Sequence, residues 1–475
     1  MAHASHPETT ASARRPTTRL HKSLSTVEYF TFGFGSMIGV AWLILMDDFL
    51  GRGGPVGGAL GFLIGGILLL PIAHTYARLA RQIQDAGAEI AYTEGVFTPF
   101  LSFATGWTMV LAYAIVCPWE AVAIGNLMSM VFPGLNSHQL WVLAGSPIYL
   151  PRLVIGLGLT ALVVGVNYRG IRLSGVMQNW MTFGLLASFG IFAALGFLRG
   201  NPSNLEPMFA HPGSAGIWLS ILMTMQIVPY YLTGFESVAK ASEEAKVGYD
   251  PRGFGHAIYM ALIGGFVFYA LVILVVPYVY HPWQDIVTGH ITTEVAFERA
   301  FGSHWIAQVI MIGAFLSLAK VFNGNFVAST RMLYGIGRRD LVHPSLARVH
   351  PEHGTPMTAI ILMGVITAIA ACLGDAILVP ISEVGSLAVA VGWLSACLAY
   401  IMRMRRADNE PRFHAMASIG VLVSVAIICM KVLPQVPGSF SGYDWLAFAV
   451  WSGLGFAFWV GRPKITAPAA MPSRG

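Results

Sequence analysis

Gly33-Phe34-Gly35-Ser36-Met37-Ile38-Gly39 interrupts an apolar segment near the start of this chain, and Pro229-Tyr230-Tyr231-Leu232-Thr233-Gly234-Phe235-Glu236 interrupts another near its middle. Backbone at bilayer depth must satisfy its own hydrogen bonds, so an irregular stretch is tolerated there only where it is buried or lines a polar cavity. A matched pair of interrupted helices, one in each half of a chain, is typical of the substrate site of secondary transporters.

The composition predicts an all-α integral membrane protein. Hydrophobic residues make up 55% of the chain and charged residues 11%, whereas soluble domains carry about 25% charged residues. Apolar stretches of about 20 residues are long enough to cross a bilayer. Twelve such spans are predicted, at about 27–50, 56–80, 100–132, 152–167, 174–198, 215–239, 254–280, 304–335, 357–374, 380–402, 413–433 and 443–461.

The distribution of positive charge predicts how these helices are oriented, because cytoplasmic loops are enriched in Lys and Arg. Of the 28 Lys and Arg residues, 22 fall on one predicted face and five on the other, with Lys320 inside a span. The protein is therefore expected in the inner or plasma membrane, with both termini in the cytoplasm. The formal charge of +5 follows from this topology and does not indicate a nucleic-acid partner.

The spacing of the two interruptions, about 195 residues, predicts two inverted repeats over about 23–200 and 213–405. Together they would form a transport core over 23–405, followed by two further helices within 406–462. Residues 1–22 and 463–475 are expected to be cytoplasmic tails, the first of them disordered. The longest outer stretches, 133–150 and 281–303, are expected to hold a short helix at most.

Short patches recur in order along residues 24–405, and together they resemble the amino acid–polyamine–organocation (APC) superfamily. The patches are Gly35-Ser36-Met37-Ile38-Gly39, Gly54-Pro55, Tyr76-Ala77-Arg78-Leu79, Asn167-Tyr168-Arg169-Gly170, Gly234-Phe235-Glu236, Glu243-Glu244, Asn323-Gly324, Ser329-Thr330-Arg331-Met332-Leu333-Tyr334, Pro344 and Gly354-Thr355-Pro356. The resemblance implies a LeuT-type fold with discontinuous helices 1 and 6. It also implies alternating access driven by an ion gradient or by exchange.

Helix 1 is expected to lose its regular winding between Ser36 and Ala41. Amide N–H groups freed there would form a site for an anion such as a substrate carboxylate. The family usually has Gly-Ser-Gly where this chain has Gly39-Val40-Ala41, which leaves recognition of an alpha-carboxylate open. The other interpretation is that the glycines only permit close helix packing. The candidate substrate-binding residues here are Ser36, Met37, Ile38, Gly39, Val40, Ala41 and Trp42.

Helix 6 would contribute Tyr230, Thr233, Gly234 and Phe235 to the same substrate site. Freed carbonyl oxygens suit a substrate ammonium group, and aromatic faces attract cations. By the resemblance, Tyr230 aligns with a gating aromatic residue. Tyr230 can equally be a core residue with a satisfied hydroxyl.

Ionisable side chains inside a membrane are costly and therefore candidates for function. Glu120 in helix 3 and Glu236 in helix 6 are two of them. Glu236 is expected either to accept hydrogen bonds from N–H groups freed by the helix break or to bind a proton or an amine. Asp47 and Asp48, at the outer end of helix 1, are either ordinary solvated carboxylates or part of a vestibule that attracts cations.

Lys320 in helix 8 is the most informative of these residues. By the resemblance, many relatives place a lysine in helix 5 where sodium-coupled relatives bind sodium. The aligned residue here is Leu185, and Asn325 aligns with the helix 8 hydroxyl of that site. Our hypothesis is that the ammonium of Lys320 replaces the ion. The alternative is a lysine that pairs with Glu120 or extends toward a membrane edge.

Several functions are disfavoured by the sequence. It has no G-x-x-x-x-G-K-[ST] loop, so ATP is not expected to drive it. Its 14 histidines are scattered, and neither a metal nor another cofactor is predicted. A membrane-embedded enzyme would need a clustered nucleophile, base or metal set. The prediction is a transporter of amino acids or related amines, proton-coupled or exchanging, and not an enzyme. A polyamine or organic-amine exchanger and a non-transporting amino-acid sensor remain alternatives.

Overall fold

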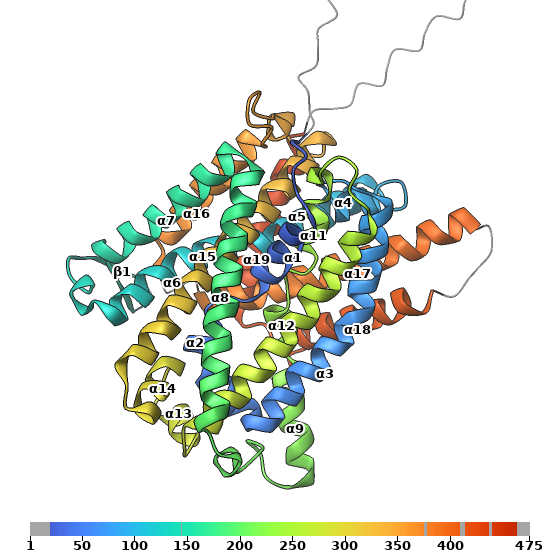
Figure 1. Cartoon of the computed structure of the whole chain (residues 1–475). Coiled ribbons are helices and arrows are strands. Elements are labelled where there is room, and N and C mark those ends of the chain that lie inside the picture. The colour runs from blue at the N-terminus through green and yellow to red at the C-terminus, as the bar shows by residue number, and fades with distance from the viewer. Residues whose placement is uncertain (1–19, 144, 375–377, 409–413, 437–438, 463–475) are drawn as a thin grey trace, which may run out of the picture.

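The protein is described here from a computed structural model that covers residues 20–143, 145–374, 378–408, 414–436 and 439–462. The tails predicted at 1–22 and 463–475 lie outside this range except for residues 20–22. Figure 1 shows a bundle of helices from which a small β-hairpin projects at one side.

The elements are as follows. The helices of the first half are α1 Thr26–Met37, α2 Ala41–Ile44, α3 Met46–Gln82, α4 Glu89–Thr93, α5 Pro99–Ala114, α6 Val116–Val131, α7 Leu150–Arg169 and α8 Ile171–Arg199. Those of the second half are α9 Gly213–Met225, α10 Val228–Tyr231, α11 Ser237–Lys240, α12 Arg252–Val279, α13 Gln284–Thr288, α14 Thr293–Phe301, α15 His304–Arg338, α16 Met357–Ala371, α17 Leu378–Asp408, α18 Ala415–Val432 and α19 Gly442–Val460. The strands are β1 Gln139–Leu143 and β2 Ser146–Tyr149, and short 3-10 helices cover Pro133–Leu135, Pro202–Leu205, Ser242–Glu244 and Pro344–Ala347.

The multi-pass character predicted from composition is confirmed. Within the described residues, nine helical stretches are long and apolar enough to cross a membrane: Thr26–Ile44, Met46–Gln82, Pro99–Val131, Leu150–Arg169, Ile171–Arg199, Arg252–Val279, His304–Arg338, Val384–Arg406 and Ala415–Val432. Three predicted spans are not among them, namely those at α9–α11, α16 and α19. Large apolar side chains point outward, and Trp180 and Leu198 on α8 are 78% and 79% exposed. Such a surface suits lipid and not water.

The predicted boundary between the first two spans is a sharp turn inside α3. Gly54 has φ +68° and ψ −178°, which is not helical. A Cβ atom at this position would lie 2.6 Å from the backbone nitrogen of Ala210, so only glycine fits both the conformation and the space. Pro55 follows, where it begins a new helical stretch without needing an N–H partner.

Both long stretches predicted to lie on the outer side, 133–150 and 281–303, differ from the prediction of a short helix at most. The first contains the antiparallel hairpin β1–β2, with a bulge between Gln139 and Trp141 and a turn in which Gly145 has φ +83°. Its strands contain Trp141, Val142, Ile148 and Tyr149, and aromatic and β-branched residues favour a pleated strand over a helix. The second stretch contains two short helices, α13 and α14.

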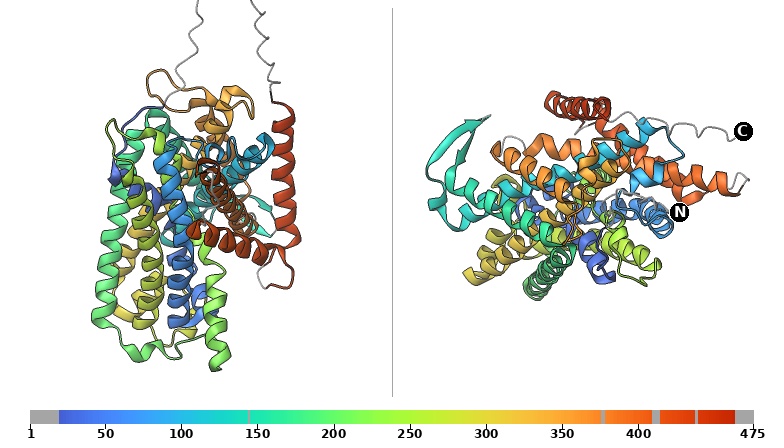
Figure 2. Two further views of the ribbon diagram at one scale, coloured as in Figure 1. Left: turned by 90° about the vertical axis from the view of Figure 1, so that its right-hand side faces the viewer. Right: turned by 90° about the horizontal axis from the view of Figure 1, so that it is seen from above.

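The last two helices pack on the outside of the bundle (Figure 2). The helix α18 contacts α3 and α17, and α19 contacts α5 and α17. Trp107 on α5 and Trp451 on α19 stack with 4.7 Å between ring centroids. Each indole N–H donates to the backbone carbonyl of the other residue, at 3.0 and 3.1 Å, so the indole groups are buried without losing their hydrogen bonds.

A buried chain of amides holds α1, α7, α8 and α15 together. Asn167 Nδ2 donates to Asn323 Oδ1 at 2.8 Å, and Asn323 Nδ2 donates to Gln178 Oε1 at 2.8 Å. Gln178 Nε2 in turn donates to the carbonyl of Thr31 at 3.1 Å. The network fixes the position of α15 against α1, where the first helix break lies.

Candidate functional site

The first helix break is shorter than the sequence predicted. The helix α1 ends at Met37, and α2 begins at Ala41. Ile38 has φ −88° and ψ 92°, which is extended. The prediction of an irregular stretch from Ser36 to Ala41 is therefore correct in place and wrong in extent. Ser36 stays in the last turn, where its hydroxyl donates to the carbonyl of Phe32 at 2.7 Å.

The second break lies between α10 and α11, over residues 232–236. Gly234 has φ +130°, a value that side chains other than glycine rarely adopt. The sequence placed the irregular stretch from Pro229 to Glu236, but Pro229 and Tyr230 belong to the short helix α10. This break is also narrower than predicted.

The second break packs directly against the last turn of α1, where the first break begins. A Cβ atom at Gly234 would lie 2.8 Å from the Cβ and 2.9 Å from the carbonyl carbon of Ser36. Ser237, which begins α11, donates from its hydroxyl to the carbonyl of Phe32 at 3.3 Å. Two segments about 200 residues apart in sequence thus meet, with the irregular backbone of the second break against the helix end at which the first break begins.

The carbonyl end of α1 is bound by the ammonium group of Lys320 on α15. Its Nζ donates to the carbonyl of Gly35 at 3.2 Å and also to the carbonyl of Ile38. The ring of Phe34 lies 5.7 Å from Nζ. Lys320 is fully buried. Among the described residues it forms no ion pair, so the alternative in which it pairs with Glu120 is not found.

Two further side chains of α15 bind the same carbonyl end. The hydroxyl of Ser317 lies 2.7 Å from the carbonyl oxygen of Ile38 and 2.8 Å from that of Gly39. Asn325 Nδ2 donates to the carbonyl of Ser36 at 3.2 Å. Ser317 was missed at the sequence level, although it lies one helical turn before Lys320 on the same face of the helix.

Glu236 stabilises the second break. Its Oε2 accepts a hydrogen bond from the backbone N–H of Gly234 at 3.1 Å, and its Oε1 accepts one from the hydroxyl of Tyr113 at 2.8 Å. The side chain is fully buried. This is the geometry expected for the first of the two predicted roles, in which Glu236 accepts from an N–H group that the helix break leaves free.

A cavity of about 300 Å³ opens beside the two breaks. The predicted residues that line it are Ser36, Met37, Gly39, Val40, Ala41, Glu120, Tyr230, Thr233 and Asn325. The lining residues that the sequence did not predict are Ile44, Leu45, Ala112, Val116, Trp119, Tyr231, Tyr269, Val321, Gly385 and Val389. A binding pocket for a small molecule typically encloses about 300–1,000 Å³, so the cavity can hold a solute of amino-acid size.

The other predicted residues lie behind this lining or away from it. Gly234 and Glu236 belong to the break itself, and Ile38 and Lys320 meet through the carbonyl described above. Trp42 packs its ring 6.1 Å from those of both Phe192 and Phe268. Phe235 stacks on Trp393 with 5.7 Å between ring centroids. The indole of Trp42 and the ring of Phe235 are thus core residues and do not line the cavity.

Asp47 and Asp48 line a different, shallow hollow at the surface, together with Gly51, Arg52, Val287 and His290. Asp48 pairs with Arg52 at 2.8 Å, and Asp47 Oδ2 lies 2.6 Å from His290 Nδ1. The charge of Asp48 is therefore compensated by Arg52, and Asp47 has a hydrogen-bonding partner in His290.

Two fully buried ion pairs, neither predicted from the sequence, join the segment after the second break to other helices. Lys240 at the end of α11 pairs with Glu89 on α4 at 2.5 Å, and Tyr76 donates to the same Glu89 oxygen at 2.6 Å. Glu244 binds Arg331 on α15 through both carboxylate oxygens, each at 3.0 Å. All four charged side chains are completely excluded from solvent.

A third cluster continues from these pairs into the loop after α3. Asp85 Oδ2 lies 2.6 Å from Arg338 and 3.0 Å from Arg339, and Arg338 also pairs with Glu243 at 2.8 Å. Burial alone would raise the pKa of Asp85, but the hydrogen bond and charge of Arg339 and the charge of Arg338 together lower it. The cluster joins α15 to the loops on the face that the Lys and Arg pattern predicts to be cytoplasmic.

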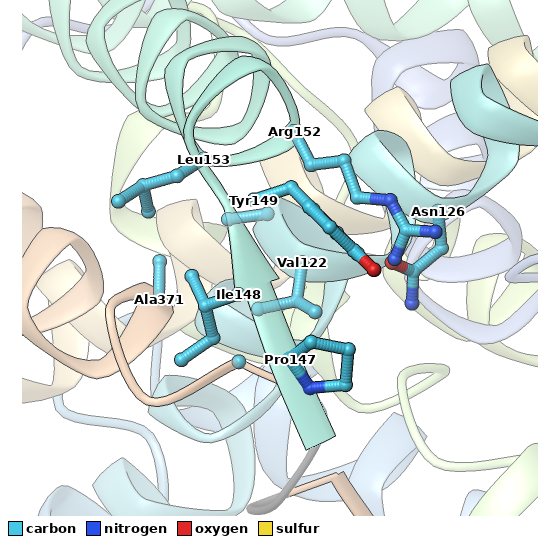
Figure 3. A pocket seen from close by; sticks show the side chains of 10 residues that line it. Val122, Asn126, Pro147, Ile148, Tyr149, Arg152, Leu153 and Ala371 are labelled. Carbon is cyan, nitrogen blue, oxygen red and sulfur yellow. The ribbon is translucent and has the colours of Figure 1, made fainter. Parts of the chain in front are cut away.

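A second hollow lies under the β-hairpin, where Arg152 and Tyr149 face Asn126 (Figure 3). The guanidinium of Arg152 donates to Asn126 Oδ1 at 3.1 Å and to Asn136 Oδ1 at 2.7 Å. The volume of this hollow is about 30 Å³, enough for about two water molecules. It is too small for an organic solute.

Comparison with known proteins places the chain among membrane transporters. The sequence pattern of the family described as "Amino acid permease" matches residues 24–457. The chain is 26% identical to the branched-chain amino acid permease BcaP of Bacillus subtilis (strain 168) over 424 residues, and these residues cover 86% of each chain. It is also 26% identical over 458 residues to the methylthioribose transporter of the same organism, covering 94% of this chain and 95% of the relative.

A plant relative shows a similar level of identity. The cationic amino acid transporter 5 of Arabidopsis thaliana is 24% identical over 459 residues, which span 93% of this chain and 77% of the relative. The family match spans nearly the whole chain and includes both helix breaks, so it concerns the complete helical bundle. The chain belongs to the amino acid permease family of the APC superfamily, and it is a membrane transporter and not an enzyme.

Proposed function

We propose that this chain is a secondary active transporter that moves amino acids or related amines across the cell membrane by alternating access. In this proposal residues 23–405 form a LeuT-type core of two inverted five-helix repeats, and two further helices within 406–462 complete twelve spans. Both termini are cytoplasmic. The observation that carries the proposal is the contact of the second break with the end of α1, where the first break begins, beside a cavity of about 300 Å³.

The backbone beside the cavity supports binding of a small polar solute. Val40 and Ala41 line the cavity, and within the described residues their N–H groups donate to no backbone carbonyl. The hydroxyl of Thr233, on the other break, donates to the carbonyl of Pro229 at 2.7 Å. Free N–H groups on one side and irregular backbone on the other thus place polar backbone beside the cavity, as is typical of substrate sites at broken helices.

The relatives support amino acids as substrates but do not identify one. Those reported above are named for branched-chain amino acids, cationic amino acids and methylthioribose. A carboxylate-free amine is the second candidate, because the lining of the cavity contains a carboxylate, that of Glu120, and no basic side chain.

We further propose that Lys320 makes sodium unnecessary. Its ammonium is held by the carbonyls of Gly35 and Ile38, and carbonyl oxygens at a helix break are the groups that coordinate Na⁺ in transporters of this kind. A covalently attached cation at these oxygens would leave proton coupling or exchange as the energy source.

The buried ion pairs support alternating access with the cytoplasmic side closed in this structure. Lys240 and Glu244 follow the second break directly, and their partners Glu89 and Arg331 come from other helices. Because these side chains are fully buried, opening a cytoplasmic path past α11 would require at least the Lys240 pair to separate or to move as a unit.

Uptake into proteoliposomes tests the proposed function. Purified full-length protein is reconstituted with an unlabelled amino-acid mixture inside, and uptake of labelled leucine and labelled 3-methylbutylamine is measured with sodium, with potassium and with a proton gradient. The expected result is saturable uptake of one of them that does not depend on sodium. Ligand-induced thermal stabilisation without any flux would favour the sensor instead.

A further inference from the structure

Glu120 is a buried carboxylate that forms no ion pair with another side chain in the described part of the chain. It lies on α6, is 2% exposed, and lines the cavity beside the helix breaks. Its Oε2 has no hydrogen-bond partner in the described part of the chain. Its Oε1 is 3.2 Å from the place where a Cβ at Gly39 would be, so the carboxylate lies directly against the irregular backbone of the first break.

The other buried carboxylates near the site differ from Glu120 in having partners. Glu236 accepts two hydrogen bonds, Glu89 pairs with Lys240, and Glu244 pairs with Arg331. Burying an ionised carboxylate without a partner is costly, so such groups are normally paired or bind a ligand. Glu120 therefore needs a hydrogen-bond donor or a cation that the protein itself does not place against it.

The rest of the lining favours a cation at this carboxylate. It contains no Lys, Arg or His side chain among the described residues, and Trp119, Tyr231 and Tyr269 contribute aromatic rings. The ammonium of Lys320 is held by carbonyl oxygens of α1 and does not line the cavity. Its charge acts on Glu120 without forming an ion pair, so it leaves the cavity side of the carboxylate open to a ligand. A ligand carboxylate would meet the like charge of Glu120, whereas an ammonium would meet an opposite charge and aromatic faces.

We propose that Glu120 binds the protonated amine of the substrate, and that the substrate is a primary amine with an apolar body and no carboxylate beside the amine. This inference rests on the proposed function, because it names the substrate class of the same cavity. Glu120 is then the residue that decides between an amine and the corresponding amino acid.

Matched ligand pairs that differ only in the carboxylate test this proposal. Binding of 3-methylbutylamine is compared with leucine, and phenethylamine with phenylalanine, by thermal shift and by competition on purified full-length protein at pH 7. The wild-type protein is expected to bind each amine at least ten times more tightly than its amino acid. Glu120→Gln is expected to weaken amine binding at least tenfold, and Glu120→Asp to weaken it less because the charge remains.

Glu294→Gln is the control variant. Glu294 is also a buried carboxylate with one unpartnered oxygen, but it lies on α14 and does not line the cavity. Its substitution is expected to leave amine binding unchanged, and melting without ligand shows whether each variant is folded.

The proposal is overturned if leucine or phenylalanine binds as tightly as its amine, if neither amine binds, or if folded Glu120→Gln binds the amines like the wild type. If Glu120→Gln does not fold, the comparison of amines with amino acids on the wild-type protein still tests the proposed substrate class. Leucine uptake with tight leucine binding would contradict only this inference, whereas no flux of any amine or amino acid would contradict the proposed function.

Discussion

Lys320 on α15 donates a hydrogen bond from its ammonium group to the carbonyl oxygen of Gly35 on α1, with 3.2 Å between the two atoms. Gly35 lies in the last turn of α1, where carbonyl oxygens have no partner within the helix and carry the negative end of the helix dipole. A fixed cation therefore stabilises the helix end that the break leaves exposed. This contact joins a buried charge to the backbone that forms the candidate site.

Removing this cation should disable transport. Lys320→Ala leaves the carbonyls of Gly35 and Ile38 without their donor, and it should lower the free energy of unfolding by about 2–3 kcal/mol. We expect uptake by the variant to fall at least tenfold, while Lys246→Ala, an exposed lysine, keeps wild-type uptake. Proteoliposome flux with and without sodium measures both effects. Clear stimulation of the wild-type protein by sodium would contradict the role given to Lys320.

Glu236 should act through the backbone of the second break. Glu236→Ala removes the acceptor of the Gly234 N–H and of the Tyr113 hydroxyl, and leaving two buried donors without partners should cost about 2–4 kcal/mol. Tyr113→Phe removes only one of these donors and should cost about 1 kcal/mol. Thermal melting of the two variants measures the difference. Equal melting temperatures would show that the N–H contact contributes nothing.

The Lys240–Glu89 pair should behave as a buried ion pair. Glu89→Gln leaves the Lys240 charge without its counter-ion and should destabilise the protein by about 3–5 kcal/mol. Replacing both side chains with apolar ones, as in Lys240→Met with Glu89→Leu, should restore most of that loss. Melting temperatures of Lys240→Met, of Glu89→Leu and of the variant with both substitutions form a double-mutant cycle. Additive effects of the two substitutions would mean that the pair is not coupled.

The Asp85 cluster should give stability that is lost in acid. The folded pKa of Asp85 lies below its ordinary value of 3.8, because the hydrogen bond and charge from Arg339 outweigh the opposing effect of burial. A carboxyl with a lowered folded pKa stabilises above its unfolded pKa and stops doing so as the pH falls through the folded value. The melting temperature of the wild type should exceed that of Asp85→Asn at pH 5–8, and the gap should close below about pH 4. A gap that stays constant down to pH 3 would contradict this.

The sequence located both helix breaks because their residues are unsuited to an uninterrupted apolar helix. Gly39 and Gly234 mark the two positions, and the patches of the family resemblance turn out to contact one another. Asn167 and Asn323, from two different patches, share a hydrogen bond of 2.8 Å. Residue type and spacing carry this information without coordinates.

The direction of each side chain could not be obtained in the same way. Trp42 follows the cavity residue Ala41 in sequence, yet successive helical residues point about 100° apart, and its ring packs in the core. Phe235 lies two residues after the cavity residue Thr233, in the irregular second break, and its ring also packs in the core. The partners of the buried ion pairs are also hidden from sequence reasoning, because Lys240 and Glu89 are 151 positions apart. The hairpin was missed because a span-length pattern says little about the short connections between spans.

The central claim is that the solute binds in the cavity beside the two breaks, and filling this cavity tests it most directly. A Cβ at Gly385 would make only ordinary contacts, 3.6 Å from Ile115 and 3.7 Å from Tyr230, whereas one at Gly158 on the outer surface of α7 would meet nothing within 4 Å. Gly385→Leu therefore extends a side chain over Tyr230, and Gly158→Leu makes the same change away from the site. The measurement is uptake of labelled substrate into proteoliposomes by these two variants. We predict that Gly385→Leu folds and loses at least nine-tenths of wild-type uptake, which corresponds to a loss of binding free energy of about 1.4 kcal/mol. Gly158→Leu is expected to keep wild-type uptake. Undiminished uptake by folded Gly385→Leu would contradict the account.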